Sequence, residues 1–198
     1  MAGPGPHPWP PVDLHARSPA FVEAAGPWIR GYNVARPARY FDRGTTSRFN
    51  APSEEFGTLY MTDDTHGAFI ESFGRQLNVR SVTANALTLR GIAQVDSVRP
   101  LRFIDLAGGL ARLGADNRLM GGDYDVTQAW AKALWEHPEQ ADGLHYALRH
   151  DPTRRGYAVF DRAEDALHAR PLGTFWDPRR RDELAGILDT YGFGLIVE

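Results

Sequence analysis

The chain has 198 residues, enough for one domain with a hydrophobic core and too few for two domains of ordinary size. Its 22 basic and 25 acidic residues give a formal net charge of −3, which argues against nucleic-acid binding driven by bulk electrostatics. Because the chain contains no cysteine, disulfides, thiolate metal sites and a cysteine nucleophile are excluded.

The sequence contains no apolar run close to the ~20 residues that span a bilayer. Its first eleven residues hold five prolines and two glycines, and they lack the basic and apolar regions of a signal peptide. We therefore expect a flexible arm over residues 1–17, one domain over residues 18–198, a cytoplasmic location and no membrane partner.

The first part of the domain combines a short helix with strands. A serine and a proline before residues 20–25, and a glycine after them, predict a short helix. Residues 28–61 are strand-like and contain two arginines, Arg30 and Arg48. Since Arg48 belongs to a Ser-Arg-Phe-Asn run that soon meets a proline, we expect it in a strand end or loop. Residues 56–61 predict a short buried strand.

Residues 63–75 predict a helix, which Asp64 or Thr65 can cap at its N-terminus. Its apolar side chains Ala68, Phe69 and Phe73 share one side. Glu71 is close to these apolar residues, so we expect its carboxylate near the buried edge of the helix. Residues 78–98 show no clear period and predict a helix followed by a loop.

The second half of the chain alternates strands and helices. A strand is expected over residues 101–106, and Gly108, Gly109 and Gly114 then mark a loop or short helix. The spacing of these glycines fits neither a dinucleotide fingerprint nor a P-loop. The clearest helical pattern starts at Asp123 or Asp125 and ends before Pro138.

Two strands, 143–148 and 156–160, follow and are joined by a polar loop. A last helix runs from residue 177 to residue 191, where Gly192 stops it, and residues 194–198 predict a terminal strand. This mixture of short strands and interspersed helices indicates an α+β fold in a single domain.

The order of these segments resembles the RES domain family, which is named for an arginine, a glutamate and a serine. The segments that carry the resemblance are 28–30, 46–52, 57–60, 69–74, 101–106, 128–130 and 142–146. Family members are the toxin half of bacterial toxin–antitoxin pairs and attack NAD. The resemblance implies a fold like the mono-ADP-ribosyltransferase core, with two small sheets that flank a nicotinamide cleft.

The resemblance assigns catalysis to Glu71, Arg48 and Arg30. Cleavage of the nicotinamide–ribose bond needs stabilisation of an oxocarbenium-like sugar, and a carboxylate that faces the ribose supplies it. Glu71 is the candidate, although surface glutamates are common on amphipathic helices. Arg48 and Arg30 would hold the phosphates through forked, charge-assisted hydrogen bonds, or else be exposed arginines at strand ends.

Aromatic residues provide candidates for stacking on the nicotinamide ring, which is a cation in NAD. Tyr60 is the first of these, and a core tyrosine is its alternative. Tyr32 and Tyr40 are weaker candidates for the same contact.

Two positions depart from the family pattern or leave its alignment open. Leu148 stands where the family pattern Tyr-x-Ser has its serine, and His150 beside it is a further candidate for contact with substrate. A second alignment of the opening strand would place Asn33, rather than Arg30, at the catalytic position. No histidine cluster has acidic residues at metal spacing, so no metal is expected.

The resemblance implies a toxin that consumes NAD as its substrate, by hydrolysis or phosphorolysis, without a cofactor. It also implies a helix-turn-helix antitoxin of the Xre type that neutralises the toxin. The alternatives are a protein ADP-ribosyltransferase, because the same cleft serves both reactions, and a weakened relative that only binds NAD or nucleotides.

Overall fold

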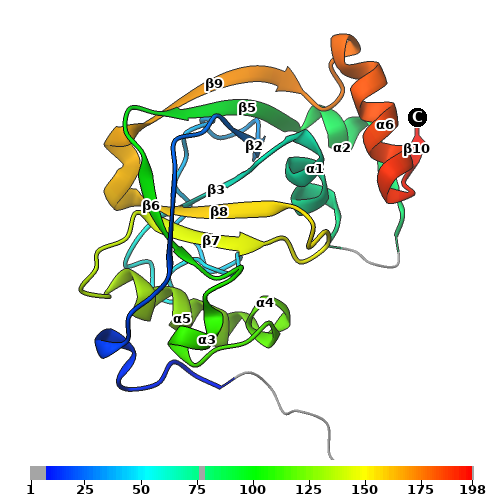
Figure 1. Ribbon diagram of the computed structural model, residues 1–198. Coiled ribbons are helices and arrows are strands. Elements are labelled where there is room, and N and C mark those ends of the chain that lie inside the picture. The colour runs from blue at the N-terminus through cyan, green and yellow to red at the C-terminus, as the bar shows by residue number, and fades with distance from the viewer. Residues whose placement is uncertain (1–7, 76–78, 198) are drawn as a thin grey trace, which may run out of the picture.

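A computed structural model describes residues 8–75 and 79–197 of the chain (Figure 1). These residues form a mixed α+β domain, as the sequence predicts. The sheets differ from the expected pair of small ones. Within the described residues there is one sheet of eight strands and a second of two.

The large sheet is strongly curved, so that β5 and β9 lie opposite β7 and β8 in the ribbon view (Figure 1). Its strand order is β1-β6-β7-β8-β3-β2-β5-β9, and its neighbours are antiparallel except β6 and β7. The strands are β1 (Phe21–Ala24), β2 (Trp28–Asn33), β3 (Thr58–Thr62), β5 (Arg90–Ser97), β6 (Leu101–Asp105), β7 (Gly143–Ala147), β8 (Arg155–Phe160) and β9 (Leu167–Thr174). The small sheet pairs β4 (Ser81–Thr83) in parallel with β10 (Gly194–Ile196).

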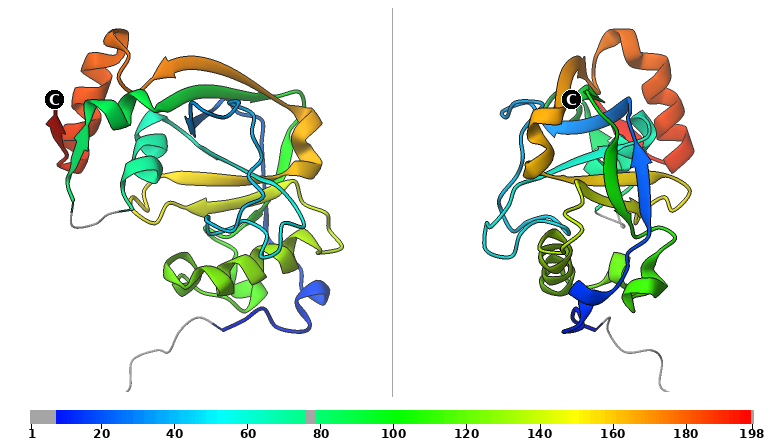
Figure 2. Two further views of the ribbon diagram at one scale, coloured as in Figure 1. Left: turned by 180° about the vertical axis from the view of Figure 1, so that it is seen from behind. Right: turned by 60° about the vertical axis from the view of Figure 1, so that its left-hand side comes forward.

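The helices gather in two groups (Figures 1 and 2). One group lies beside β7 and contains α3 (Leu110–Leu113), α4 (Arg118–Gly121) and α5 (Tyr124–Trp135). The other lies at the end of the sheet near β4 and β10 and contains α1 (Thr65–Phe73), α2 (Ala84–Thr88) and α6 (Arg181–Tyr191). Short 3-10 turns complete the fold: η1 (Leu14–Ala16), η2 (Asp161–Ala166) and η3 (Pro178–Arg180).

The two faces of the large sheet bury different apolar clusters. In β3 the side chains alternate, so that Leu59 and Met61 pack with Trp28 on one face. Tyr60 points to the other face and packs against the larger cluster, which includes Phe69 of α1. This alternation turns one face of β3 towards α1.

Several predicted elements are confirmed. The helix over 63–75 is α1, and Asp64 caps it by accepting a hydrogen bond from the Gly67 amide at 2.8 Å. The strands at 101–106, 143–148 and 156–160 are β6, β7 and β8, and the clearest helical pattern is α5. The last helix ends at Gly192, whose φ of 64° lies in the left-handed region that glycine adopts without steric cost.

Two predicted elements are wrong. Residues 20–25 do not form a helix, because Phe21–Ala24 pairs with β6 as an edge strand, with Val22 opposite Phe103. Residues 79–98 contain β4, α2 and the eight-residue strand β5, where a helix and a loop were expected; residue 78 lies outside the described part of the chain. In both cases pairing with distant strands overrides weak local preference.

Residues 8–17, expected in the arm, contact the domain. Leu14 is 3% exposed, the Trp130 indole N–H donates to the Pro8 carbonyl at 2.9 Å, and Arg17 donates to the Leu113 carbonyl at 2.7 Å. Residues 1–7 lie outside the described part, and the division between arm and domain at residue 18 stays a prediction. None of the described helices is long and apolar enough to cross a membrane.

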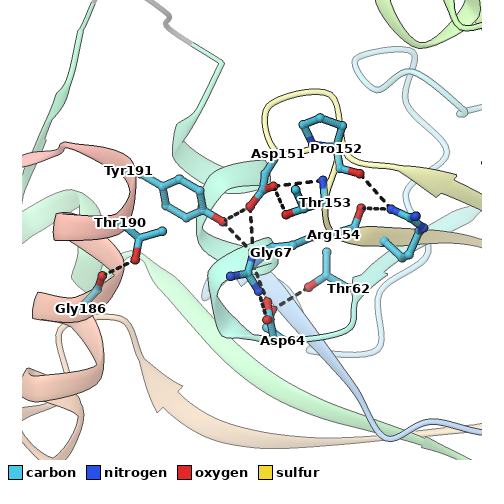
Figure 3. A network of polar contacts seen from close by, with 11 residues as sticks. Thr62, Asp64, Gly67, Asp151, Pro152, Thr153, Arg154, Gly186, Thr190 and Tyr191 are labelled. Atoms are coloured by element: carbon cyan, nitrogen blue, oxygen red, sulfur yellow. Dashed lines mark hydrogen bonds and ion pairs between the residues drawn. The ribbon is translucent and has the colours of Figure 1, made fainter.

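A polar network fixes the start of α1 to the loop after β7 and to α6 (Figure 3). Arg154 pairs with the capping residue Asp64, and its Nε donates both to Asp151 Oδ2 at 2.9 Å and to the Tyr191 hydroxyl at 3.0 Å. The Tyr191 hydroxyl in turn donates to Asp151 at 2.8 Å. The helix that carries Glu71 is therefore held at its N-terminus by two other parts of the chain.

Candidate functional site

A pocket of about 550 Å³ opens where β2 and β3 separate. Within the described chain these strands share a single register pair, Ile29 with Thr62. The pocket walls come from β2, β3 and α1, from the loop between residues 34 and 57, from the end of β7 and from the α4–α5 region. A volume of this size is typical of sites for small molecules and cofactors.

The pocket lining is strongly cationic. It contains six arginines but only two carboxylates, Asp42 and Glu71, a formal balance of +4 in a chain whose net charge is −3. The arginines are Arg30, Arg36, Arg48, Arg75, Arg90 and Arg149. Across residues 8–75 and 79–197, none of the six forms an ion pair. Unpaired guanidinium groups in a concave site favour an anionic ligand.

Glu71 contributes a partly buried carboxylate from α1. Burial raises the pKa of this carboxyl group, while the neighbouring guanidinium groups of Arg75 and Arg48 act in the opposite direction. The helix approaches β2 closely, since a Cβ placed on Gly31 would lie only 2.7 Å from the Ser72 hydroxyl and 3.1 Å from the Ala68 carbonyl. Glycine at position 31 therefore permits the position of the helix that brings Glu71 to the pocket.

Arg48 faces Glu71 from the loop between β2 and β3. Its Nη1 donates to the Gly122 carbonyl at 2.9 Å, and its guanidinium lies 5.2 Å from the ring centre of Tyr124. Burial lowers the pKa of Arg48, and nearby Arg149 lowers it further. Its Nε and Nη2 donate to no residue in the described chain, so two donor nitrogens remain for a ligand.

Arg30 is held by the protein itself. It is 8% exposed, and its two terminal nitrogens donate to the Tyr60 and Tyr40 carbonyls, both at 3.0 Å. Burial lowers its pKa to about 10, so the side chain is still charged at neutral pH. These contacts bridge the gap between β2 and the loop, and they favour a role in building the pocket wall. Asn33, the alternative position, lies at the pocket edge, where its side chain accepts a hydrogen bond from the Ala35 amide.

Tyr60 lines the pocket, and its hydroxyl is bonded within the protein. The hydroxyl donates to Asn50 Oδ1 at 3.0 Å and accepts from the Phe49 amide at 2.9 Å. Asn50 Nδ2 then donates to Asp42 at 2.9 Å. Burial raises the pKa of Tyr60, so its hydroxyl keeps its proton. The network fixes the backbone directly after Arg48.

The remaining predicted residues separate into two groups. Tyr32, Tyr40 and His150 line the pocket, whereas Leu148 does not. Burial lowers the pKa of His150, as do nearby Arg149 and other guanidinium groups, so its imidazole is neutral at pH 7.

Leu148 was expected to contact substrate, and the structure corrects this expectation by placing the side chain in the core. The side chain is 1% exposed and belongs to the main apolar cluster. Its Cδ2 lies so close to Gly156 that a Cβ there would be 2.6 Å away. Leucine at this position fills the core, and the structure gives it no contact with the pocket.

The pocket residues that sequence reasoning did not select include Tyr146, Arg75, Arg36 and Arg90. One signal was available for Arg75, which follows Glu71 by four residues, the spacing of side chains on one helix face, although α1 itself ends at Phe73. Arg36 and Arg90 carry no such signal, because only the pairing of β2 with β5 brings their segments together. No cluster of metal-binding side chains occurs among the residues that the structure describes.

The fold and the pocket define an α+β protein with a cationic ligand site that contains one carboxylate on α1. The chain belongs to the RES domain family, whose family model matches residues 22–180. It is similar to the probable toxin y4kH of Sinorhizobium fredii (strain NBRC 101917 / NGR234), with 31% identity over 106 residues. That match covers 52% of this chain and 81% of the relative.

The fold is similar to a solved structure, the crystal structure of the M. tuberculosis MbcT–MbcA toxin–antitoxin complex. The TM-score is 0.59 at 19% identity, and the match covers 84% of this chain and 92% of the other. At this identity the likeness concerns the fold.

Proposed function

We propose that the chain is the toxin of a toxin–antitoxin pair and that it cleaves the nicotinamide–ribose bond of NAD. Membership of the RES domain family supports this, as do a relative described as a probable toxin and a fold found in a toxin–antitoxin complex. By analogy, its partner is an antitoxin, which we expect to be a helix-turn-helix protein of the Xre type.

The observation that carries the proposed chemistry is the carboxylate of Glu71, one of only two carboxylates in a pocket dominated by guanidinium groups. NAD has a complementary pattern, because its nicotinamide riboside end is cationic and its pyrophosphate is anionic. Arg48, whose Nε and Nη2 donate to no residue in the described chain, would bind the pyrophosphate. Tyr60, which also lines the pocket, would contact the nicotinamide cation through its ring.

In the proposed reaction the bond between the anomeric carbon and the nicotinamide nitrogen breaks, and its electron pair stays on nicotinamide. The leaving group is therefore neutral, and positive charge develops on the ribose. The ionised carboxylate of Glu71 stabilises this charge. Water or inorganic phosphate then forms the new bond to the anomeric carbon, and a proton is released when water attacks.

The direct test is release of free nicotinamide when the purified protein is incubated with NAD. Glu71→Gln keeps the shape of the side chain and removes its charge, so the rate should fall by about a hundredfold or more. Glu23→Gln is the matched control, because Glu23 is exposed on β1 and does not line the pocket. Equal rates for Glu71→Gln and the wild type would remove Glu71 from the mechanism.

Product analysis separates the reactions that share this cleft. Hydrolysis gives ADP-ribose, phosphorolysis gives ADP-ribose phosphate only when phosphate is present, and ADP-ribosyl transfer labels a protein from labelled NAD. The binding-only alternative depended on the absence of a hydroxyl at residue 148, a side chain that lies in the core. Binding of NAD without nicotinamide release would nevertheless support it.

The toxin role has a separate test in cells. Expression of the wild type should arrest growth and lower the NAD pool, and expression of Glu71→Gln should do neither. Co-expression of a neighbouring helix-turn-helix gene should restore growth. Growth arrest by both forms would show that toxicity, if present, does not depend on NAD cleavage.

A further inference from the structure

The arginines of the pocket fall into two groups at opposite ends of a row of strands. Arg149 follows β7, whereas Arg90 starts β5, and the strand order between them is β7-β8-β3-β2-β5. Neighbouring strands lie about 4.8 Å apart, so four spacings would place the two ends up to about 19 Å apart in a flat sheet. The curvature of the sheet shortens this distance (Figure 1).

The group near β7 surrounds Glu71. The charges of Arg75 and Arg48 lower the pKa of the Glu71 carboxyl group, and the charge of Arg149 lowers the pKa of Arg48. This end of the pocket contains the carboxylate for the ribosyl cation and guanidinium groups for the adjoining pyrophosphate. Its charges are matched by the reactive half of NAD.

The group near β5 consists of Arg36 and Arg90. Arg90 is opposite Asn33 in the register of β2 and β5, and Arg36 follows in the turn after β2, where its amide donates to the Asn33 carbonyl. The Arg36 guanidinium lies 4.8 Å from the ring centre of Tyr40. Neither guanidinium group forms a hydrogen bond or an ion pair with any residue in the described ranges, although both line the pocket.

The positive charges of Arg36 and Arg90 exceed those that the phosphates of NAD can neutralise. NAD carries one negative charge on each of its two phosphates and one positive charge on nicotinamide, against a pocket balance of +4. The other pocket carboxylate is Asp42. Its negative charge favours the charged form of Arg30, and it accepts hydrogen bonds from Asn50 and Gly44. A phosphate monoester would add about −1.5 to −2 at pH 7. Arginines recognise such a group on the adenosine ribose in other dinucleotide sites.

We propose that the preferred substrate is a nicotinamide dinucleotide with an additional phosphate on its adenosine ribose, as in NADP, and that Arg36 and Arg90 bind this phosphate. The inference rests on the proposed function, because it places the cleaved bond at Glu71. The reaction at the nicotinamide end is unchanged, so the extra phosphate acts through binding.

The test compares kcat/KM for NADP and NAD, measured as nicotinamide release. The wild type should prefer NADP by about tenfold or more, the usual effect of hydrogen bonds to a charged group. Arg90→Ala and Arg36→Ala should each lower the preference, and the double variant should abolish it. Arg112→Ala is the matched control, because Arg112 is an exposed arginine of α3 outside the pocket, and it should leave the preference unchanged.

A binding measurement keeps this inference separate from the proposed function. Calorimetric titration with ADP-ribose and with 2′-phospho-ADP-ribose involves no bond cleavage. Tighter binding of the 2′-phosphate form, weakened by Arg90→Ala, supports the phosphate site even if neither dinucleotide is cleaved. Equal affinities, or a preference that Arg90→Ala and Arg36→Ala leave intact, would show that both arginines are merely solvated and would overturn the inference.

Discussion

The carboxylate of Glu71 is costly for the fold and useful for the proposed reaction. Burial disfavours its charged form, and its pKa is raised although two arginines act on it. A raised pKa in the folded state means that ionisation of Glu71 destabilises the protein. Activity and stability are therefore expected to oppose one another at this residue.

Glu71→Gln should accordingly be more stable than the wild type at neutral pH. Below the pKa of an unfolded glutamate, about 4.3, Glu71 is protonated in both states and the two proteins should differ least. The advantage of the variant should grow as the pH rises from the unfolded pKa towards the raised folded-state pKa of Glu71, and it should level off above that pKa. Thermal melts of both proteins between pH 4 and pH 8 measure this. A stability difference that does not change with pH would contradict the assigned pKa shift.

Leu148 provides a second prediction at the residue scale. Leu148→Ser removes buried apolar volume next to Gly156 and adds an unpaired hydroxyl, so it should lower the free energy of unfolding by about 2–5 kcal/mol. Leu195→Ser, at a leucine that is 40% exposed on β10, is the control and should change stability little. Urea unfolding measures both. A gain in NAD cleavage by Leu148→Ser would show instead that the residue reaches substrate.

At the scale of elements, the pocket depends on how β2, β3 and α1 are arranged. β2 and β3 separate after their single register pair, Arg30 bridges the opening, and α1 packs over β2 at Gly31. An Arg30 substitution should lower thermal stability as well as activity, because Arg30 is buried and the two backbone carbonyls that it contacts would lose their donors.

Gly31→Ala tests the approach of α1 to β2. The added methyl group would lie 2.7 Å from Ser72 Oγ and 3.1 Å from the Ala68 carbonyl, so the Ser72 side chain or the helix must shift, and overpacking of this kind costs about 1–3 kcal/mol. Glu71 precedes Ser72, and we expect NAD cleavage to fall together with stability. Gly186→Ala is the control, because a Cβ at that site in α6 has open space and alanine favours a helix. A fully active Gly31→Ala protein would show that the close approach is not required.

Elements with strong local signals could be predicted from the sequence, and elements defined by distant pairing could not. The Asp64 cap and the apolar face of α1 are local, and so is the glycine that ends α6. β1 and β5 depend on partners far along the chain. Glu71, Arg48 and Tyr60 were selected through the resemblance to the RES domain family and do line the pocket, whereas Arg36 and Arg90 are brought there by the distant pairing of β2 with β5.

At the scale of the whole molecule, positive charge is concentrated in one pocket of a chain with a net negative charge. Such a distribution attracts anionic ligands to the pocket while the rest of the surface repels them. Because the lining residues Arg36, Arg75 and Arg149 are exposed to solvent, this attraction should be sensitive to salt.

We therefore expect the KM for NAD to rise about threefold or more when sodium chloride is raised from about 0.1 to 1 M, since the Debye length falls from about 10 to 3 Å. The value of kcat should change less, because Glu71 acts at short range. Steady-state rates at several salt concentrations measure this, with a thermal melt at each to confirm that the protein stays folded. A KM that is independent of salt would contradict an electrostatic role for the arginines.

The most direct test of the central claim is a crystal structure of Glu71→Gln with intact NAD. We predict that the anomeric carbon of the nicotinamide ribose faces residue 71, that the pyrophosphate contacts Arg48, and that the nicotinamide ring lies against Tyr60. NAD bound outside the pocket, or bound with its nicotinamide ribose away from residue 71, would contradict the account.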